Sequence, residues 1–238
     1  MISKHTLSRL KPNLRSYITS FLLFTIFSVS AVSAQHVKIA THLGDLVFKL
    51  SDQTPKHTAN FIKLAKKGYF NTYDFNRVIK GFVIQGGETD SAYAAMEKSG
   101  QVLERMMPEF TPQLFHQKGA LAAGRDDNKK KSSFSGQFYV VDGKKYTDTQ
   151  LDAIEKRKGN GFRFSDETRR IYKEIGGTPS LDQDYTVFGQ LVSGWEVLES
   201  IAGQMKDKTD KPLQKVAIQV SVLSKKQVAK LPKARNNF

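Results

Sequence analysis

Few residues of this 238-residue chain have the types and spacing that acid–base, nucleophilic or metal chemistry requires. The chain has no cysteine, which excludes disulfides, thiol nucleophiles and thiolate metal sites. His42, His57 and His116 are far apart and have no ligand-like neighbours, so we expect no metal site. A phosphate-binding glycine loop and a nucleophile-elbow serine are also missing from the sequence. Any reaction would therefore need little acid–base or covalent help, and we expect no cofactor.

One segment stands out. Residues 75–87 read Phe-Asn-Arg-Val-Ile-Lys-Gly-Phe-Val-Ile-Gln-Gly-Gly and resemble the central signature of cyclophilins, Phe-His-Arg-Val/Ile-Ile-x-Gly-Phe-x-x-Gln-Gly-Gly. Four further segments resemble the family in the expected order: residues 54–61, 119–122, 135–140 and 181–189. Together the five segments cover roughly residues 36–223. One such segment would be weak support, whereas five in order are specific.

The resemblance implies a peptidyl-prolyl cis/trans isomerase with a mainly β fold: a closed eight-stranded antiparallel barrel capped by two helices, with the active site on its outer face. In this resemblance, Arg77 corresponds to the catalytic arginine of the family. The resemblance also implies a set of substrate-binding residues. The proline pocket would be formed by Phe82, Gln85, Phe138, Tyr139 and Leu181, its rim by Gln137 and Tyr185, and the groove for the substrate backbone by Gly124 and Arg125.

These residue types suit the reaction. A prolyl amide resists rotation with a barrier of about 18–20 kcal/mol, although its two isomers differ by only about 0.5–1 kcal/mol. When the bond is twisted, conjugation is lost and the proline nitrogen regains a lone pair. A permanently protonated donor such as Arg77 can then bond that nitrogen, and an interaction present only in the transition state accelerates the step.

The sequence departs from the family pattern at four places near the site. Asn76 stands where the family usually has histidine, and we expect little cost from it. Val83 replaces a longer side chain and Tyr139 replaces phenylalanine, which predicts a reshaped and slightly more polar pocket. Ser180 occupies the position of a tryptophan that, in many eukaryotic members, donates its ring N–H to the inhibitor cyclosporin.

Other interpretations remain open. Taken alone, Arg77 could be a surface ion-pair partner, and Phe82 or Phe138 could be plain core. The same groove could also hold proline-containing segments without useful turnover, as a binding module or chaperone. A third possibility is a basic surface that binds anionic polymers. We expect proline-containing polypeptides as partners, no nucleic acid, and a monomer.

The elements that would position these residues follow from hydrophobic periodicity. Alternating apolar residues predict a hairpin around Gly44, and Thr54 and Pro55 predict the N-cap and first residue of a helix. Two further strands are predicted within residues 74–87, on either side of a turn at Lys80 and Gly81. The other predicted strands are 119–123, 137–141, 186–191 and 215–223. A surface loop is predicted over 125–133 and a helix over 195–202.

Residues 142–178 read as an insertion rich in helix formers. We predict one helix from Thr147 or Asp148, with Leu151 and Ile154 facing inward, and a second from Ser165, with Ile171 and Ile175 facing inward. These apolar stripes are too small for a core of their own, so the helices should lie against the barrel or each other. The insertion is predicted to be a surface lobe that alters substrate choice and leaves the chemistry unchanged.

Residues 35–223 form the predicted isomerase domain, and the segments on either side of it differ from it in composition. Residues 1–34 combine a basic head, a short apolar run and small residues at 31–34, which predicts a signal peptide cleaved after Ala34. A membrane anchor is the alternative, but it would need about 20 apolar residues. We therefore expect no stable membrane insertion after cleavage, and a location in a bacterial periplasm or outside the cell.

The chain is strongly basic. Residues 1–34 hold four of the 37 basic residues and none of the 23 acidic ones, so cleavage would lower the formal charge from +14 to +10. Part of this charge lies in the tail, residues 224–238, which has five cations and no acid. The tail is predicted to be solvated and disordered.

Overall fold

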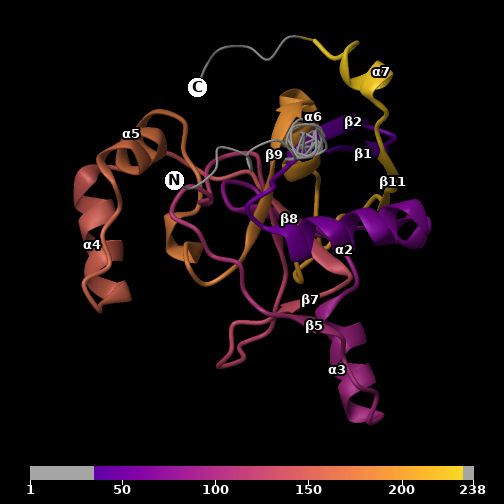
Figure 1. Ribbon diagram of the computed structural model, residues 1–238, viewed down its shortest axis with the longest axis horizontal. Helices are drawn as coiled ribbons and strands as arrows, with labels where there is room; N and C mark the ends of the chain where they lie inside the picture. The colour runs from indigo at the N-terminus through magenta and orange to yellow at the C-terminus, as the bar shows by residue number, and fades with distance from the viewer. Residues whose placement is uncertain (1–34, 233–238) are drawn as a thin grey trace, which may run out of the picture. The chain divides into compact units, whose positions relative to one another are not determined.

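The structure is a computed structural model that describes residues 35–232 (Figure 1). The predicted signal peptide and the last six residues of the tail lie outside the described residues. The strands are β1 His36–Thr41, β2 Gly44–Leu50, β3 Asp74–Ile79, β4 Val83–Gly87, β5 Arg105–Met106, β6 Ala120–Ala123, β7 Ser133–Phe134, β8 Gln137–Val141, β9 Val187–Ser193, β10 Val216–Ala217 and β11 Gln219–Val222. The α-helices are α2 Pro55–Lys66, α3 Asp90–Lys98, α4 Asp148–Lys158, α5 Asp166–Glu174, α6 Trp195–Ala202 and α7 Lys225–Val228, with 3-10 turns η1 Tyr69–Thr72 and η2 Pro179–Leu181.

Within the described residues, nine strands form one antiparallel sheet in the order β10-β3-β4-β8-β6-β9-β2-β1-β11. The two end strands, β10 and β11, are consecutive in the chain and are separated only by Ile218, whose N–H bonds the carbonyl of Tyr73. The sheet therefore returns to itself and forms a nearly closed barrel, which leaves few unpaired edges. The predicted eight-stranded barrel differs from this count because the strand predicted over 215–223 divides at Ile218.

The core fills the inside of the barrel. Val37 and Ile39 of β1 and Leu46, Phe48 and Leu50 of β2 are buried, as the period of two along a strand requires. Two helices cover this core: α2 contributes Phe61, Ile62 and Ala65, and α6 contributes Val197, Leu198, Ile201 and Ala202. Each of the larger apolar side chains stabilises the fold by about 1.5–3 kcal/mol when fully buried. The prediction of a mainly β barrel capped by two helices is confirmed.

The first turn of α2 is capped by a distant residue. Thr54 occupies the predicted N-cap position, but its side chain makes no capping bond, and its buried Oγ1 has no partner among the described residues. The carboxylate of Glu109 instead accepts the backbone N–H of Lys56 at 3.1 Å and that of His57 at 3.0 Å. The capping role predicted for Thr54 is wrong, because the free amides at the helix start are satisfied by a residue some fifty positions later.

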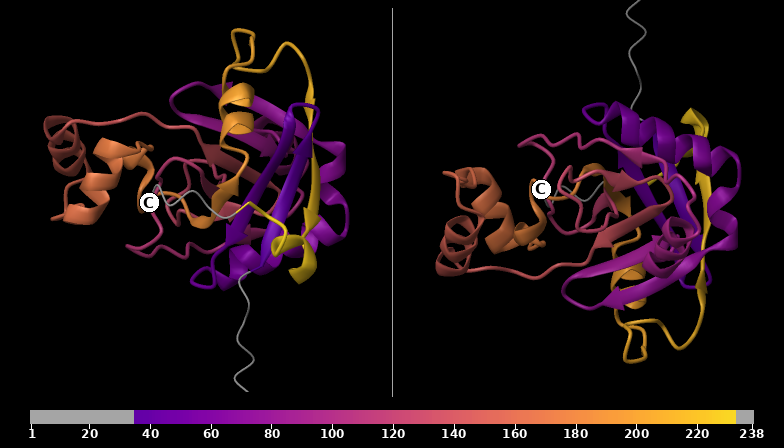
Figure 2. Two further views of the ribbon diagram at one scale, coloured as in Figure 1. Left: turned by 90° about the horizontal axis from the view of Figure 1, so that it is seen from above. Right: turned by 90° about the horizontal axis from the view of Figure 1, so that it is seen from below.

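The predicted insertion forms two helices. Thr147 and Gln150 make a capping box at the start of α4, and Ser165 caps α5. Leu151 of α4 is buried as predicted, together with Ile154. In both views of Figure 2 these helices, drawn in salmon and orange, lie to one side of the strands.

The inward face of α5 differs from the prediction. Tyr172 and Thr168, four residues apart, are buried, whereas Ile171 and Ile175 are only half-buried. Tyr172 packs with Leu151, Ile154 and Phe164 in a cluster separate from the barrel core. The helix is therefore rotated by about one residue from the predicted phase, because a large aromatic ring fills the space that the isoleucines were expected to fill.

Two short helices were not predicted. Thr89 caps α3, and Ser224 and Gln227 make a capping box at α7. The beginning of the predicted disordered tail is therefore helical over Lys225–Val228, since local capping suffices for one exposed turn.

Within residues 35–232, the structure has no helix of the length and apolar character needed to span a bilayer.

Candidate active site

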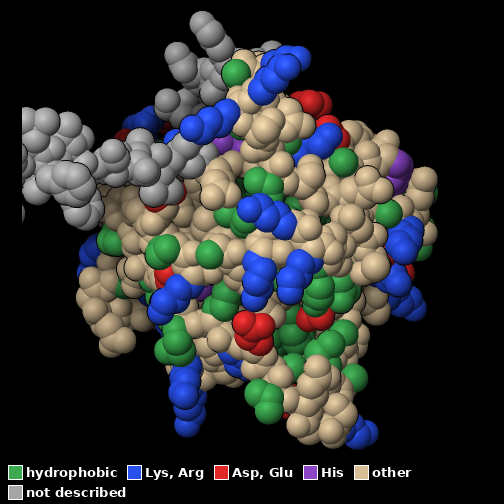
Figure 3. Space-filling model, turned by 45° about the vertical axis from the view of Figure 1, so that its right-hand side comes forward, with side chains coloured by type: hydrophobic (Ala, Val, Ile, Leu, Met, Phe, Trp, Pro, Cys, Tyr) green, Lys and Arg blue, Asp and Glu red, His purple; other side chains and the backbone are tan. Residues whose placement is uncertain are grey.

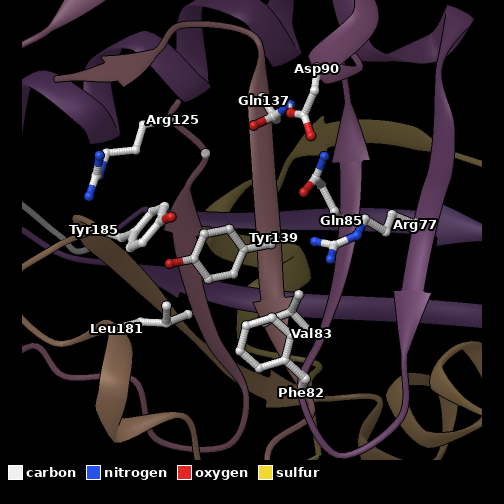
Figure 4. Close-up of a pocket in the computed structure, with 11 residues that line it drawn as sticks. Arg77, Phe82, Val83, Gln85, Asp90, Arg125, Gln137, Tyr139, Leu181 and Tyr185 are labelled. Atoms are coloured by element: carbon white, nitrogen blue, oxygen red, sulfur yellow. Dashed lines mark hydrogen bonds between the residues drawn. The ribbon is translucent and has the colours of Figure 1, made fainter. Parts of the chain in front are cut away.

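A pocket of about 160 Å³ opens on the outer face of the barrel, across β3, β4 and β8 and beside the loops that follow β6 and η2 (Figure 4). Its lining comprises Arg77, Phe82, Val83, Gln85, Asp90, Gly124, Arg125, Gln137, Tyr139, Leu181 and Tyr185. All but one of the site residues predicted from the sequence line this pocket. In Figure 4, Arg77 and Gln85 lie on one side of the Tyr139 ring, and Leu181 and Tyr185 lie on the other.

The strand period brings the polar residues to one face. Arg77 of β3 is paired in register with Gln85 of β4, and both side chains point outward, whereas their neighbours Val78 and Ile84 are fully buried in the core. The side chain of Arg77 is 39% exposed, and that of Gln85 is almost buried. A permanently charged donor and an amide therefore lie side by side at the edge of the pocket.

Phe138 is the exception among the predicted residues. It precedes Tyr139 on β8 and therefore points to the opposite face of the strand. Its ring packs in the core against Phe61, Phe70 and Phe75 at centroid distances of 5.5, 5.4 and 6.0 Å. The prediction that Phe138 lines the proline pocket is wrong, because neighbouring residues of a strand cannot both face the same pocket.

Gln137 is held by two acceptors on the segment after β4. Its Nε2 donates to Oδ1 of Asp90 at 2.8 Å and to the carbonyl of Glu88 at 3.0 Å. A Cβ at Gly124 would lie 2.0 Å from Oε1 of Gln137, so only glycine fits there while Gln137 keeps this position. Asp90 was not predicted, and no motif in its surroundings indicates that it contacts Gln137.

Arg125 supports the wall of the pocket formed by residues 181–185. Its Nε donates to the carbonyl of Asp184 at 2.6 Å, and its guanidinium lies 4.6 Å from the centre of the Tyr185 ring. A cation over an aromatic face contributes about 0.5–1 kcal/mol at an exposed position. Arg125 therefore fixes Tyr185, and the 3-10 turn η2 places Leu181 beside it.

Tyr139 forms the floor of the pocket. Its ring lies 5.7 Å from that of Tyr185, nearly perpendicular to it, and its hydroxyl is 2.9 Å from Nε2 of His116. Burial raises the pKa of the Tyr139 phenol well above its ordinary value, so the hydroxyl stays protonated. The sequence predicted that this tyrosine would make the pocket slightly more polar. Its hydroxyl, however, points to His116 inside the protein and away from the pocket surface.

A second residue that the sequence did not indicate is Asp210, in the loop between α6 and β10. Its Oδ2 lies 3.7 Å from Nε of Arg77, and its carbonyl accepts the N–H of Val78 at 2.8 Å.

Over residues 35–232, no cluster of three or more His, Asp or Glu side chains could hold a metal ion. The site thus offers an apolar floor, a charged donor and amide groups, which together can bind an apolar ring and donate to an atom next to it.

The comparisons with known proteins agree with this geometry. Residues 36–222 match the family model described as cyclophilin type peptidyl-prolyl cis-trans isomerase/CLD. A Staphylococcus saprophyticus protein assigned to the peptidyl-prolyl cis-trans isomerases is 34% identical over 190 residues, which is 79% of this chain and 91% of that protein. A Staphylococcus aureus protein with the same assignment is 34% identical over 192 residues, 79% of this chain and 92% of that protein.

Solved structures show the same similarity. A Cryptosporidium parvum cyclophilin type peptidyl-prolyl cis-trans isomerase superposes with a TM-score of 0.58 at 26% sequence identity, covering 81% of this chain and 99% of the other. A second structure of that protein, determined in the presence of the dipeptide Ala-Pro, gives a TM-score of 0.57 at 26% identity and covers 80% of this chain and 99% of the other.

Proposed function

This chain belongs to the cyclophilin-type peptidyl-prolyl cis-trans isomerases, and we propose that it acts on proline-containing segments of exported proteins and thereby assists their folding. The observation that carries the proposal is the pairing of Arg77 with Gln85 in a pocket that also contains the apolar side chains of Phe82, Val83 and Leu181. That arrangement places a charged donor next to the site where a pyrrolidine ring would bind.

The reaction can proceed without proton transfer. The ring of the substrate proline lies on Tyr139 between Phe82 and Leu181, which exclude water from it. As the X–Pro bond twists, its nitrogen becomes a hydrogen-bond acceptor, and Arg77 donates to it. The planar ground state lacks this bond, so the bond lowers the barrier instead of only tightening binding.

A charged hydrogen bond contributes about 1.5–3 kcal/mol, or one to two orders of magnitude in rate. The remaining acceleration must come from orientation and from removal of water around the amide. Gln85 and Gln137 are suited to orientation, since both are nearly buried and both present amide groups to the pocket. Gln137 is fixed by its bonds to Asp90 and Glu88.

The exported role is supported by the sequence of residues 1–34, with its basic head, apolar run and small residues. Newly exported chains reach their compartment unfolded, and slow proline isomerisation then limits their folding. An isomerase in the same compartment would remove that limit.

Two alternatives account less well for the site. A binding module that only holds proline-containing segments would not need a charged donor beside the ring, and Arg77 is present. A surface that attracts anionic polymers would gather unpaired cations. On the face shown in Figure 3 the Lys and Arg side chains are spread out and interspersed with acidic ones, and Lys131 and Lys158, which line one hollow, are both paired with Asp184.

The test is an NMR exchange assay on an X–Pro tetrapeptide, with the purified chain lacking residues 1–34 and its Arg77→Ala variant. The wild type should accelerate exchange, and the variant should lose at least tenfold, since one decade corresponds to about 1.4 kcal/mol. Arg170→Ala is the control, because the ion-pair partners of that exposed arginine, Glu167 and Glu174, lie on its own helix. Peptide binding without acceleration by the wild type would instead support the binding module.

A further inference from the structure

A chain of buried polar side chains connects the insertion with the floor of the pocket. The hydroxyl of Tyr172, on α5, lies 2.7 Å from Oδ2 of Asp182. Oδ1 of Asp182 lies 2.7 Å from Nδ1 of His116 and also accepts the backbone N–H of His116 at 2.8 Å. Nε2 of His116 lies 2.9 Å from the hydroxyl of Tyr139. Side chains from α5, from the residue after η2, from the segment before β6 and from β8 thus meet in one relay.

All four members are buried. Tyr172 is 0% exposed, His116 1%, Tyr139 5% and Asp182 6%. Water cannot replace a lost partner at such positions, and a buried group left unpaired costs about 1–3 kcal/mol. Hydrogen bonds in such a network strengthen one another, so the loss of one bond can be felt at the next.

The protons of the relay have a consistent arrangement. Burial raises the pKa values of both phenols well above their ordinary value, so Tyr139 and Tyr172 keep their protons. The carboxylate of Asp182 only accepts, which makes Tyr172 and Nδ1 of His116 its donors and, in that tautomer, leaves Nε2 of His116 to accept from Tyr139. Tyr172 donates to Asp182, and Tyr139 donates to Nε2 of His116. The imidazole then carries its proton on Nδ1, from which it donates to Asp182. In this arrangement each hydroxyl and each ring nitrogen of the relay is satisfied.

The insertion holds Tyr172 in place at the start of the relay. The backbone N–H of Thr178 bonds the carbonyl of His116 at 2.8 Å, and Gly177 exchanges two backbone bonds with Lys144, so both ends of the insertion are fastened beside His116. The ring of Tyr172 packs edge-on against Phe115, the residue before His116, at 5.5 Å. The helix that carries Tyr172 is thus fixed relative to the histidine.

We propose that Tyr172 is a positioning residue for the proline pocket, acting through Asp182 and His116 on the hydroxyl of Tyr139. The inference rests on the proposed function, since it takes Tyr139 as the surface on which the substrate proline lies. It makes the insertion a support of the active site. A phenylalanine in place of Tyr139, as the family commonly has, would contact the substrate but could not be coupled to the insertion in this way.

The test is a double-mutant cycle with Tyr172→Phe and Tyr139→Phe, read as kcat and KM in the tetrapeptide assay together with thermal unfolding. Tyr172→Phe should lower kcat/KM at least threefold in the wild-type background, and less than 1.5-fold in the Tyr139→Phe background, where the link to the pocket is already broken. Equal losses in both backgrounds, or no loss in the wild type, would overturn the proposal. The control is Tyr146→Phe, which removes a hydroxyl from another half-buried tyrosine of the insertion and should leave kcat/KM unchanged.

A second measurement does not depend on isomerase activity. Nitrogen NMR of the His116 ring in the wild type should show a neutral imidazole protonated at Nδ1, and Tyr172→Phe should shift the resonances of Nε2 and of the Tyr139 ring. A proton on Nε2 would refute the relay even in an active enzyme. Conversely, the expected spectrum in a chain without isomerase activity would leave the relay standing and refute the proposed function.

Discussion

Arg77 and Asp210 form an ion pair at the edge of the pocket, with 3.7 Å between Nε of the arginine and Oδ2 of the aspartate. Because Asp210 approaches Nε, the two terminal nitrogens of the guanidinium can point toward the pocket. The loop that carries Asp210 is itself held to β3, since the carbonyl of Asp210 accepts the N–H of Val78 and Lys206 donates to the carbonyl of Val78. Asp210 is therefore suited to orient Arg77, the proposed catalytic donor.

We predict that Asp210→Asn lowers kcat/KM by up to about fivefold, because an exposed ion pair contributes about 0–1 kcal/mol. Asparagine is the suitable replacement, since Asp210 has a φ of 67°, a region that asparagine tolerates. The loss should shrink as salt is added, because salt screens exposed charges. Tetrapeptide assays over a salt series test this, with Asp45→Asn, which removes the surface pair with Lys38, as the control.

If Asp210→Asn were as inactive as Arg77→Ala, the aspartate would have a direct part in the reaction. If it were fully active at low salt, Arg77 would be oriented by other contacts.

Acid should weaken the attachment of α2. The pKa of His57 is lowered by burial, although its hydrogen bond to Glu109 opposes the shift. Burial alone would raise the pKa of Glu109, but the bonds it accepts from the ring and N–H of His57 and from the N–H of Lys56 outweigh burial and lower it. Both groups therefore bind protons less readily in the native chain than in the unfolded one.

Stability consequently falls as the pH drops below the unfolded pKa of histidine, about 6.5, and falls further once Glu109 is protonated. We predict that Glu109→Gln lowers the free energy of unfolding by about 1–2 kcal/mol at pH 7. The difference from wild type should shrink as the pH falls below the ordinary pKa of a glutamate, about 4.3, and through the lower native pKa of Glu109, where the wild type also loses the charge. Urea unfolding at each pH measures this, with Glu104→Gln, at an exposed surface pair, as the control. A difference that stays constant with pH would show that Glu109 acts by shape alone.

The sequence predicted most of the site because a single strand pair carries its chemistry. Arg77, Phe82 and Gln85 lie within one segment, so their relative positions follow from the turn at Lys80 and Gly81 and from the period of two. The same period would have excluded Phe138, since Tyr139, its neighbour, was also placed in the pocket. The error came from carrying a family pattern over without applying the alternation to it.

Contacts between distant segments could not be predicted in this way. Asp90 reaches its partner from the first residue of α3, and Glu109 and Asp210 reach theirs from loops, where no periodicity indicates which way a side chain points. Tyr172 meets Asp182 only because α5 folds back beside His116, and the rotation of α5 was itself predicted wrongly by about one residue. These residues are fixed by tertiary packing, on which local patterns carry little information.

Export remains a prediction from residues 1–34, and it can be tested in a bacterial host. The full chain should be recovered from the periplasmic fraction with an N-terminus at or near Gln35, because the small residues at 31–34 suit signal peptidase cleavage. A chain that begins at Gln35 behind an initiator methionine should stay in the cytoplasm. Recovery of chains that start at Met1 and remain in the membrane fraction would instead support an anchor.

The last prediction concerns cyclosporin and Ser180. In family members with a tryptophan at this position, the ring packs against the drug and donates its N–H to it. Ser180 lies in η2, directly before Leu181, and lines a hollow together with Lys131, Arg157 and Lys158, whereas Leu181 lines the active-site pocket. A serine offers little area to the drug, and the loss of a packed aromatic anchor costs about 2 kcal/mol or more, roughly thirtyfold in affinity.

We therefore expect cyclosporin to inhibit this enzyme far more weakly than it inhibits members with the tryptophan, while catalysis persists because Arg77 and the pocket floor are unaffected. Val83, shorter than the usual residue, should weaken binding further. Titration of the isomerase activity with the drug tests the expectation, and Ser180→Trp should recover tenfold or more in affinity with little change in kcat/KM. The same substitution at Ser193, at the end of β9, serves as the control for adding an indole elsewhere. Tight inhibition of the wild type, or no gain from the tryptophan at 180, would mean that the drug contacts a different part of the rim and that the loop around η2 is aligned incorrectly with the family.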